Sequence, residues 1–270
     1  MKNLVIALLF TVHVSYAAFE RWNSGADVLA MGGASVAVPG SGWAMFSNPA
    51  LLQLADSRLL SLAYTPQPFG MKELARGSLA FIQPTEMGAF GVSAVRFGFE
   101  LYREITLSAS YAHTLADRFH LGVTFNYHTL TIQNYGSDAA FAFDVGFLTE
   151  IVENVQWGFS ALNVNAARIS QEKERLPQLY ATGISYQPAS DITLAADIVK
   201  DIRFPAELRI GVGYQLHEYV QLRAGSATEP ATLNAGLGIR YSLLQLDYAI
   251  TNHHDLGMTH QFSLTLNLGE

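Results

Sequence analysis

The chain has 270 residues, of which 50% are hydrophobic and only 14% are charged, whereas an average soluble domain carries about 25% charged residues. Half of the chain can be buried, which excludes a disordered protein, and a net charge of -7 argues against a nucleic-acid partner, because phosphate binding requires a basic surface. The absence of cysteine excludes disulfides, thiol nucleophiles and zinc-thiolate sites.

Residues 1–17 have the pattern of a secretory signal peptide. Lys2 precedes an apolar stretch over residues 4–10, and the small residues Ser15 and Ala17 occupy the two positions that signal peptidase inspects. We predict cleavage after Ala17 and export of the mature chain. The alternative is an anchor helix that stays attached, but the apolar stretch is shorter than the roughly 18 residues that a spanning helix needs. No later apolar run approaches that length, so a helical membrane protein is not expected.

Residues 18–56 are too irregular for a sheet and too apolar for a free tail, so we expect them to be packed inside the protein. Two motifs stand out there: Met31, Gly32 and Gly33, and then Asn48, Pro49 and Ala50. The two glycines permit positive φ and close backbone approach, although a plain turn before the first strand is an alternative. The proline fixes a turn and keeps the preceding asparagine out of the helical region, where its side chain can bind nearby backbone.

From about residue 58 onward the dominant period of the sequence is two, which is typical of strands with unlike faces. In residues 119–128, for example, Phe, Leu, Val, Phe and Tyr alternate with His, Gly, Thr, Asn and His. Most segments of this kind approach the length of about 9 to 11 residues that a tilted strand needs to cross a bilayer. Fourteen are predicted, at residues 58–65, 75–84, 87–97, 104–114, 118–130, 139–150, 155–164, 178–187, 191–200, 206–216, 219–227, 231–242, 244–252 and 258–268.

The connections between these segments alternate between short and long. Two to four residues follow most even-numbered segments, as at residues 84–86 and 217–218, whereas longer stretches such as 65–74 and 165–177 follow most odd-numbered ones. Outer-membrane barrels have this asymmetry, with tight periplasmic turns and longer outer loops. The sequence therefore predicts an all-β protein, a transmembrane antiparallel barrel of about fourteen strands over residues 57–270, in the outer membrane of a Gram-negative cell envelope.

The composition of the polar strand faces favours a barrel over a two-sheet sandwich. A sandwich exposes its polar face to water and would carry long charged side chains there, but here that face holds small residues, among them Gly122, Gly146, Gly158, Gly183, Gly211, Gly213, Gly225, Gly236 and Gly238. We interpret these glycines as the wall of a narrow lumen packed against an internal segment. On the opposite face, we expect these aromatic residues to meet lipid: Tyr111, Tyr127, Trp157, Tyr186, Tyr241 and Tyr248.

A set of charged residues falls on the same inward faces: Asp144, Asp197, Glu207, Arg209, Arg223, Arg240 and Asp247. Both signs mix over the tenth to thirteenth segments, so we expect these side chains to pair. Such a network could form a gate or filter, and the alternative is ordinary charge compensation inside a barrel.

The segment from Ala30 to Leu52 resembles the N-terminal region of the FadL-like outer-membrane family, which includes long-chain fatty-acid and aromatic-hydrocarbon transporters and the PorV/PorQ proteins of type IX secretion. The resemblance rests on the Met-Gly-Gly-Ala stretch at residues 31–34 and the Asn-Pro-Ala motif at residues 48–50. It implies that residues 18–56 form a hatch, or plug, inside a fourteen-stranded barrel. This chain departs from the family in its shorter outer loops, where Phe69, Met71 and Leu74 are the only apolar residues that could begin a capture groove, and in its non-aromatic end at Gly269.

Enzyme motifs are not evident in the sequence. Gly236 and Gly238 lack the third glycine and the helix of a dinucleotide site, and no serine lies in a nucleophile elbow. The adjacent residues His253, His254 and Asp255 lack further ligands and are interpreted as a solvated loop rather than a metal site. We expect no enzymatic activity, no metal and no cofactor.

Three functions remain open. The resemblance implies passive passage of hydrophobic small molecules, without a cofactor or an energy source. A PorV/PorQ-like accessory of a secretion system, which would bind exported proteins through its rim and turns, is the first alternative, and a purely structural barrel is the second. The expected partners are therefore outer-membrane lipid together with either a hydrophobic small molecule or secretion-system proteins, and no nucleic acid.

Overall fold

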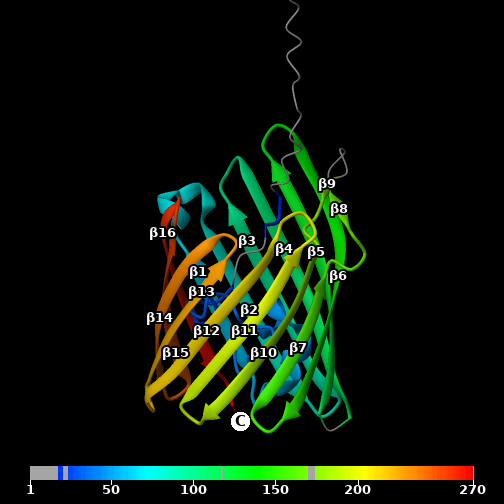
Figure 1. Ribbon diagram of the computed structural model, residues 1–270. Helices are drawn as coiled ribbons and strands as arrows, with labels where there is room; N and C mark the ends of the chain where they lie inside the picture. The colour runs from blue at the N-terminus through cyan, green and yellow to red at the C-terminus, as the bar shows by residue number, and fades with distance from the viewer. Residues whose placement is uncertain (1–17, 21–23, 117, 170–173, 270) are drawn as a thin grey trace, which may run out of the picture.

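A computed structural model describes residues 18–20, 24–116, 118–169 and 174–269, and in it the chain forms a closed antiparallel β-barrel (Figure 1). Within these ranges fourteen strands make the wall, each paired with its neighbour in the chain. The predicted fold class is thereby confirmed. The predicted segments and the observed strands agree to within about three residues, because strands with one apolar and one polar face are recognisable from alternation alone.

The wall strands have the following bounds: β1 (Leu59–Thr65), β2 (Arg76–Thr85), β3 (Gly88–Gly98), β4 (Tyr102–Ala116), β5 (Phe119–Ile132), β6 (Gly136–Val152), β7 (Val155–Leu162), β10 (Leu179–Ala189), β11 (Ile192–Asp201), β12 (Ala206–His217), β13 (Val220–Thr228), β14 (Ala231–Tyr241), β15 (Leu244–His253) and β16 (Gly257–Asn267). Strands β8 (Arg168–Ile169) and β9 (Glu174–Arg175) form a separate two-stranded sheet in the connection after β7, so β7 pairs directly with β10. Pairing of β1 with β16, from Leu59 opposite Asn267 to Tyr64 opposite Phe262, closes the barrel.

The two faces of the wall differ as the alternation predicts. On β5 the outward residues Val123 and Phe125 are 52% and 40% exposed, whereas the inward residues Thr124 and Asn126 are buried. The six aromatic residues expected to meet lipid all occupy outward positions of this alternation: Tyr111, Tyr127, Trp157, Tyr186, Tyr241 and Tyr248. The exterior is therefore apolar, and the sandwich alternative is excluded by the closed sheet.

The two ends of the barrel are different. The tight turns, such as the one between β2 and β3, lie at the end where the C-terminus is found, which we call the short-turn end (Figure 1). The opposite long-loop end carries the connection with η2 (Pro68–Gly70) and η3 (Lys72–Leu74) and the connection with β8 and β9. Strand β1 starts at the short-turn end, where Leu268 N donates to Arg58 O at 2.8 Å.

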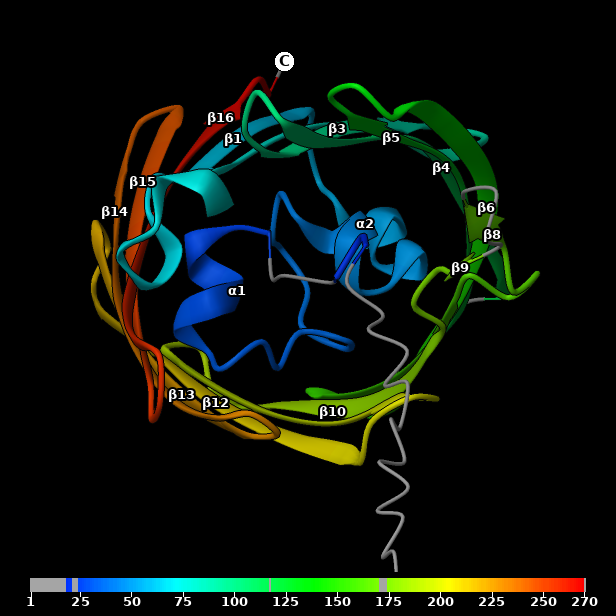
Figure 2. The same cartoon turned by 90° about the horizontal axis from the view of Figure 1, so that it is seen from above.

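The residues before β1 lie inside the ring of strands (Figure 2). We call residues 18–20 and 24–56 the internal segment, which contains α1 (Ala26–Ala30), α2 (Ala44–Ser47) and η1 (Pro49–Leu54). Helix α1 contacts strands β13 to β16, while η1 contacts β2 to β6 on the other side. The predicted signal peptide, residues 1–17, lies outside the described residues. None of the helices in the described ranges is long and apolar enough to cross a membrane.

Candidate functional site

The internal segment is seated against the glycines of the wall. Nine glycines were predicted to form the lumen wall. At six of them an added Cβ would overlap or crowd the internal segment: Gly122, Gly146, Gly158, Gly211, Gly225 and Gly236. A Cβ on Gly225, for instance, would overlap the backbone of Met31 and Gly32. The other three lie against side chains of the wall itself: Gly183, Gly213 and Gly238. Close packing of this kind requires the absence of side chains on one partner.

The stretch from Met31 to Gly33 is a tight turn pressed onto β12 and β13. Gly32 and Gly33 have φ of 68° and 78°, which is the left-handed region that glycine enters without strain. A Cβ on Gly32 would lie 2.6 Å from Ser226 N and 2.9 Å from Ile210 O, so both the backbone angle and the available space require glycine there. The sequence analysis also considered a plain turn before the first strand. Residues 31–33 do form a turn, but this turn lies deep in the barrel.

Asn48 joins two parts of the internal segment to the wall. Its side chain is fully buried, and its Nδ2 donates to Val36 O and to Phe147 O on β6, both at 2.9 Å. Its Oδ1 accepts from Ala50 N at 3.1 Å and so caps η1, which begins at Pro49. Asn48 itself is extended, with φ of -154° and ψ of 111°, as expected for the residue before a proline.

Apolar packing completes the seat on this side of the barrel. Leu52 and Met45 pack with Ile82 and with small wall residues of β1 to β4, and Leu51 packs with Leu148 of β6. Burying such side chains stabilises the seated segment by about 1.5–3 kcal/mol each. Whether this segment is a hatch, in the sense that its displacement opens the lumen, stays a prediction.

The seven charged residues singled out from the sequence lie on the inward faces, but only four of them form ion pairs with one another. Arg223 Nη1 donates to Asp247 Oδ1 at 2.7 Å, and Arg209 Nη2 donates to Glu207 Oε2 at 2.7 Å. The other three bind uncharged groups. Asp197 accepts the backbone N–H of Ser35 and of Val36, at 2.7 and 2.9 Å, so it holds the internal segment rather than a cation.

Arg240 and Asp144 also bind amides or backbone. Arg240 lies at the short-turn end and donates to Gln245 Oε1 through Nε and Nη2, and Gln245 Nε2 donates in turn to Asp247 Oδ2 at 2.9 Å. Asp144 accepts from Asn126 Nδ2 at 2.8 Å and from Asn163 N at 2.8 Å. Arg240, Asp247 and Arg223 therefore belong to one cluster that Gln245 joins, while the Arg209–Glu207 pair, Asp197 and Asp144 bind at other places along the wall.

Asp27 of α1 is a further buried carboxylate that the sequence reasoning missed. It lies near the Arg223–Asp247 pair, and Ser41 Oγ donates to its Oδ2 at 2.7 Å. Burial and, second, the charge of Asp247 raise the pKa of Asp27 above its ordinary value, against the opposing effects of Arg223 and Ser41. The charge pattern of the strands gave no signal for Asp27, because it lies in the irregular N-terminal segment.

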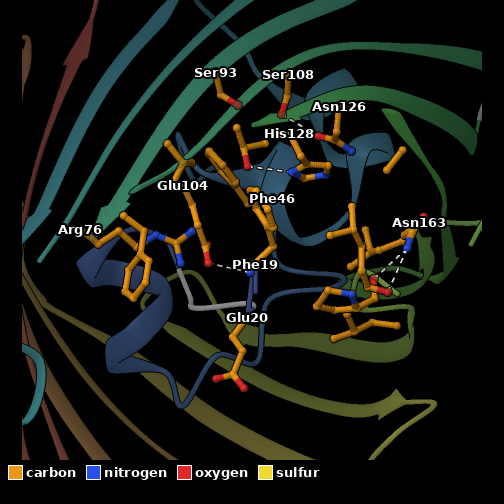
Figure 3. A pocket seen from close by; sticks show the side chains of 18 of the residues that line it. Phe19, Glu20, Phe46, Arg76, Ser93, Glu104, Ser108, Asn126, His128 and Asn163 are labelled. Atoms are coloured by element: carbon orange, nitrogen blue, oxygen red, sulfur yellow. Dashed lines mark hydrogen bonds between the residues drawn. The ribbon is translucent and has the colours of Figure 1, made fainter. Parts of the chain in front are cut away.

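A cavity of about 540 Å³ lies between the internal segment and the long-loop end, on the side of β3 to β7 (Figure 3). Its walls combine strand positions with parts of the internal segment and of the connection after β1. The apolar residues that line it are Phe19, Met45, Phe46, Phe69, Met71, Leu74, Val95, Phe97, Phe99, Ala142, Leu162, Leu176, Pro177, Leu179 and Leu256. We call it the aromatic cavity.

The aromatic cavity also has a polar side. Glu104 is buried and accepts from Phe19 N at 3.0 Å and from Tyr102 OH at 2.6 Å. Arg76 lies near Glu104 and reaches the internal segment through Nη2, which donates to Ser24 Oγ at 3.3 Å. Figure 3 shows Arg76, Glu104 and Phe19 grouped on one side of the cavity.

Arg76 also borders a second cavity of about 540 Å³, which lies on the side of β10 to β16. This cavity has fewer aromatic residues and includes two pairs of opposite charges, Arg203 with Asp201 and Arg209 with Glu207. Phe69 and Glu20 border both cavities, so the lumen above the internal segment holds two chambers that share part of their lining.

The sequence analysis identified only part of the lining of these chambers. Phe69, Met71 and Leu74, the three residues expected to begin a groove, do line the aromatic cavity. The expectation concerned the outer loops alone, whereas strand interiors and the internal segment supply most of the lining of this cavity. Alternation alone could have placed Glu104 and Arg76 inside, because Glu104 lies on the same strand face as the buried Ser110 and Arg76 on the same face as the buried Ser78.

The histidine-rich loop at residues 253–255 shows no arrangement for a metal. His253 Nδ1 accepts from Asp255 N and Leu256 N, at 3.1 and 3.2 Å, and thereby closes the turn between β15 and β16. Over the described ranges there is no group of three or more His, Cys, Asp or Glu side chains that could hold a metal ion.

Comparison with known proteins relates this chain to others through its fold. No family model and no curated protein matches the sequence. Among solved structures, the CymD monoaromatic hydrocarbon channel superposes with a TM-score of 0.68 at 14% identity, over 91% of this chain and 98% of that one. The Pseudomonas putida toluene transporter TodX superposes with a TM-score of 0.65 at 14% identity, over 92% and 99%.

A Pseudomonas aeruginosa FadL homologue also superposes, with a TM-score of 0.62 at 14% identity, over 90% of this chain and 98% of the other. The predicted resemblance to FadL-like barrels is thus confirmed at the level of the fold. All three matched structures are nearly covered from end to end, so the likeness extends over the whole barrel.

Proposed function

We propose that this protein is an outer-membrane channel for small, largely apolar molecules, which enter at the long-loop end, occupy the aromatic cavity and pass the internal segment to reach the short-turn end. Passage is passive and uses no cofactor. The aromatic cavity is the observation that carries this proposal.

The size and the lining of the aromatic cavity suit such a ligand. Its volume of about 540 Å³ falls in the range of roughly 300–1,000 Å³ typical of small-molecule sites. Six aromatic rings border it, from Phe19, Phe46, Phe69, Phe97, Phe99 and Tyr102, and aromatic side chains bind apolar molecules through a large contact area. CymD and TodX, which have the same fold, are described as a monoaromatic hydrocarbon channel and a toluene transporter.

The outer surface supports a place in the outer membrane. Large apolar side chains cover the outward strand positions, for example Leu62, Val92, Leu208 and Leu246 at 45%, 51%, 46% and 56% exposure. A closed barrel satisfies every backbone hydrogen bond of its wall and so can lie in lipid. Migration that changes on heating in detergent gels is the expected behaviour, whereas a mature chain that is soluble and monomeric without detergent would contradict this placement.

The internal segment lies between the aromatic cavity and the short-turn end, so a ligand that crosses the lumen has to displace it. Deletion of residues 26–52 tests this role as a hatch. We expect the shortened barrel to insert and to conduct ions far better than the wild type in planar bilayers. Equal conductance with and without the segment would contradict the assignment of residues 18–56 as a plug.

Uptake of toluene into proteoliposomes tests the function directly. Phe97 lines the aromatic cavity, so Phe97→Asp, which places a charge among apolar walls, should reduce uptake to the level of empty liposomes. Phe97→Leu keeps the wall apolar and serves as the matched control, with uptake near that of the wild type. Equal uptake by both variants and by the wild type would refute the cavity as the route.

Mass spectrometry of the detergent-extracted protein separates the remaining alternatives. A bound apolar molecule supports the channel. A stoichiometric protein partner without a small molecule would favour a secretion accessory of PorV/PorQ type, and bare protein with unchanged hydrocarbon uptake in a deletion strain would favour a structural barrel.

A further inference from the structure

The wall of the aromatic cavity carries a row of polar residues on β3, β4 and β5. Ser93 lies directly opposite Ser108, and Ser108 lies directly opposite Asn126. All three side chains line the cavity (Figure 3). Because opposite residues of antiparallel strands lie side by side, the row forms one continuous polar strip.

Two members of this row already have partners. Ser108 Oγ donates to Asn126 Oδ1 at 2.6 Å, and Asn126 Nδ2 donates to Asp144 Oδ2 at 2.8 Å. Ser93 differs from them. It is only 6% exposed, and its Oγ has no hydrogen-bond partner in the part of the chain that the structure describes. A buried hydroxyl without a partner costs about 1–3 kcal/mol.

The polar row lies deep in the aromatic cavity. Gly91, the inward position before Ser93 on β3, faces Leu52 of the internal segment, and the following inward positions toward the long-loop end are Val95 and Phe97. Along β3 the lining therefore changes from apolar at Phe97 and Val95 to polar at Ser93, while Glu104 on β4 lies opposite Phe97.

The charge of the lining argues against an anionic ligand. Four carboxylates, Glu20, Glu73, Glu104 and Asp144, border the aromatic cavity with a single arginine, Arg76. A carboxylate in this space would be repelled, while the groups next to Ser93 in the polar row are an uncharged hydroxyl and an amide.

From these observations we propose that the aromatic cavity selects neutral aromatic molecules that carry one hydroxyl group, with the ring among the phenylalanines and the hydroxyl bonded to Ser93 Oγ. This inference rests on the proposed channel function and specifies its substrate class. The hydroxyl of the ligand supplies the hydrogen bond that Ser93 lacks, whereas a pure hydrocarbon leaves Ser93 unsatisfied.

Equilibrium dialysis of labelled ligands against the full-length processed protein in lipid nanodiscs tests the proposal, with binding to empty nanodiscs subtracted. Four probes of similar size are compared: toluene, p-cresol, benzoate and benzylamine. We expect p-cresol to bind about tenfold more tightly than toluene, the effect of one ordinary hydrogen bond. Benzoate should bind more weakly than p-cresol because the carboxylates repel it, and benzylamine should bind more weakly because its ammonium group loses its hydration beside the uncharged hydroxyl of Ser93.

Variants of Ser93 test whether its hydroxyl causes the preference for p-cresol over toluene. Ser93→Ala should weaken p-cresol binding until its affinity lies within about twofold of that for toluene, while Ser93→Thr should retain the preference. Ser160→Ala is the matched control, because Ser160 Oγ is also buried without a partner among the described residues but does not line the aromatic cavity. This control should bind all four probes as the wild type does.

The outcomes separate the two levels of the argument. If neither toluene nor p-cresol binds the wild type, the proposed channel function fails together with this inference. If both bind with equal affinity, or if a charged probe binds best, the channel survives and the hydroxyl selection is overturned. The comparison in the wild type alone decides this, even when Ser93→Ala does not fold.

Discussion

Replacement of Asn48 by alanine should loosen the internal segment. Asn48→Ala removes three hydrogen bonds, to Val36 O, Phe147 O and Ala50 N. Each contributes about 1 kcal/mol net to stability, so the seated state loses roughly 3 kcal/mol, and more if the buried carbonyls find no new partner. A loss of this size shifts an equilibrium about 150-fold.

Planar-bilayer conductance measures the consequence, because under the proposed role as a hatch a loosened segment no longer blocks the lumen. Of the three hydrogen bonds, the one to Phe147 O joins Asn48 to the wall. Its loss alone shifts the equilibrium between seated and loosened segment about fivefold. Loss of the two bonds within the segment increases this shift toward the value for all three bonds. We expect the open fraction of the Asn48→Ala channel to lie between these limits, with the heat-modifiable barrel intact.

Asn163→Ala is the matched control. Asn163 is also a buried asparagine with three hydrogen bonds, to Leu176 O, Pro177 O and Ala167 N, but they hold the connection between β7 and β10. Its loss should lower the thermal stability by a similar amount without raising conductance. Unchanged conductance in Asn48→Ala, or an equal rise in both variants, would refute the reasoning.

Three further predictions concern the internal segment and the wall around it. Gly225→Val should unseat the turn by overlap, costing about 1–3 kcal/mol or more and raising conductance, whereas Gly77→Val, where a Cβ meets open space, should not. Burial raises the pKa of Asp27 when the internal segment is seated. Protonation of Asp27 therefore favours the seated state, and this stabilisation is complete at pH values below the ordinary pKa of 3.8. It is lost as the pH rises through the raised pKa of the seated state. Conductance should therefore rise with pH in the wild type and stay flat in Asp27→Asn. Arg223→Ala should destabilise the barrel by about 3–5 kcal/mol, because Asp247 is left buried and unpaired, while replacing both by leucine should restore most of the thermal stability.

Each of these predictions has a contrary result. Equal conductance of the two glycine variants would show that the contact with Met31 does not seat the turn. A pH dependence that persists in Asp27→Asn would assign the effect to another group, and a double leucine variant as unstable as Arg223→Ala would mean that the ion pair itself, rather than the desolvated charge, stabilises this wall.

The strand pattern was predictable from the sequence because it is local. In a barrel wall, lipid on one side and the lumen on the other impose a period of two on every strand, and this period can be read without knowing any partner. Turn lengths alternate because antiparallel neighbours place successive connections at opposite ends of the barrel, and one end carries the longer loops. Even the use of glycine on the inward face indicated that something is packed there.

The pairing of the inward charges was less predictable. Arg223 and Asp247 lie on different strands, and their meeting depends on the register of β13, β14 and β15. Asp197 shows the same dependence, because its partners are backbone N–H groups of the internal segment that no pattern along the chain announces. Alternation predicts that a side chain points inward. Whether it then binds a cation, an amide or a backbone group depends on which residue the fold places opposite it.

The sequence by itself therefore determined the closed barrel, its orientation of faces and the packed character of residues 18–56, since these follow from alternation, turn lengths and composition. Only the tertiary structure decided where the cavities lie and what lines them. The aromatic cavity joins Phe19, Phe46 and Phe97, which are far apart in the chain and lie in elements of different kinds. The route of the internal segment through the lumen creates this site. That route depends on tertiary contacts, which produce no repeating pattern in the sequence.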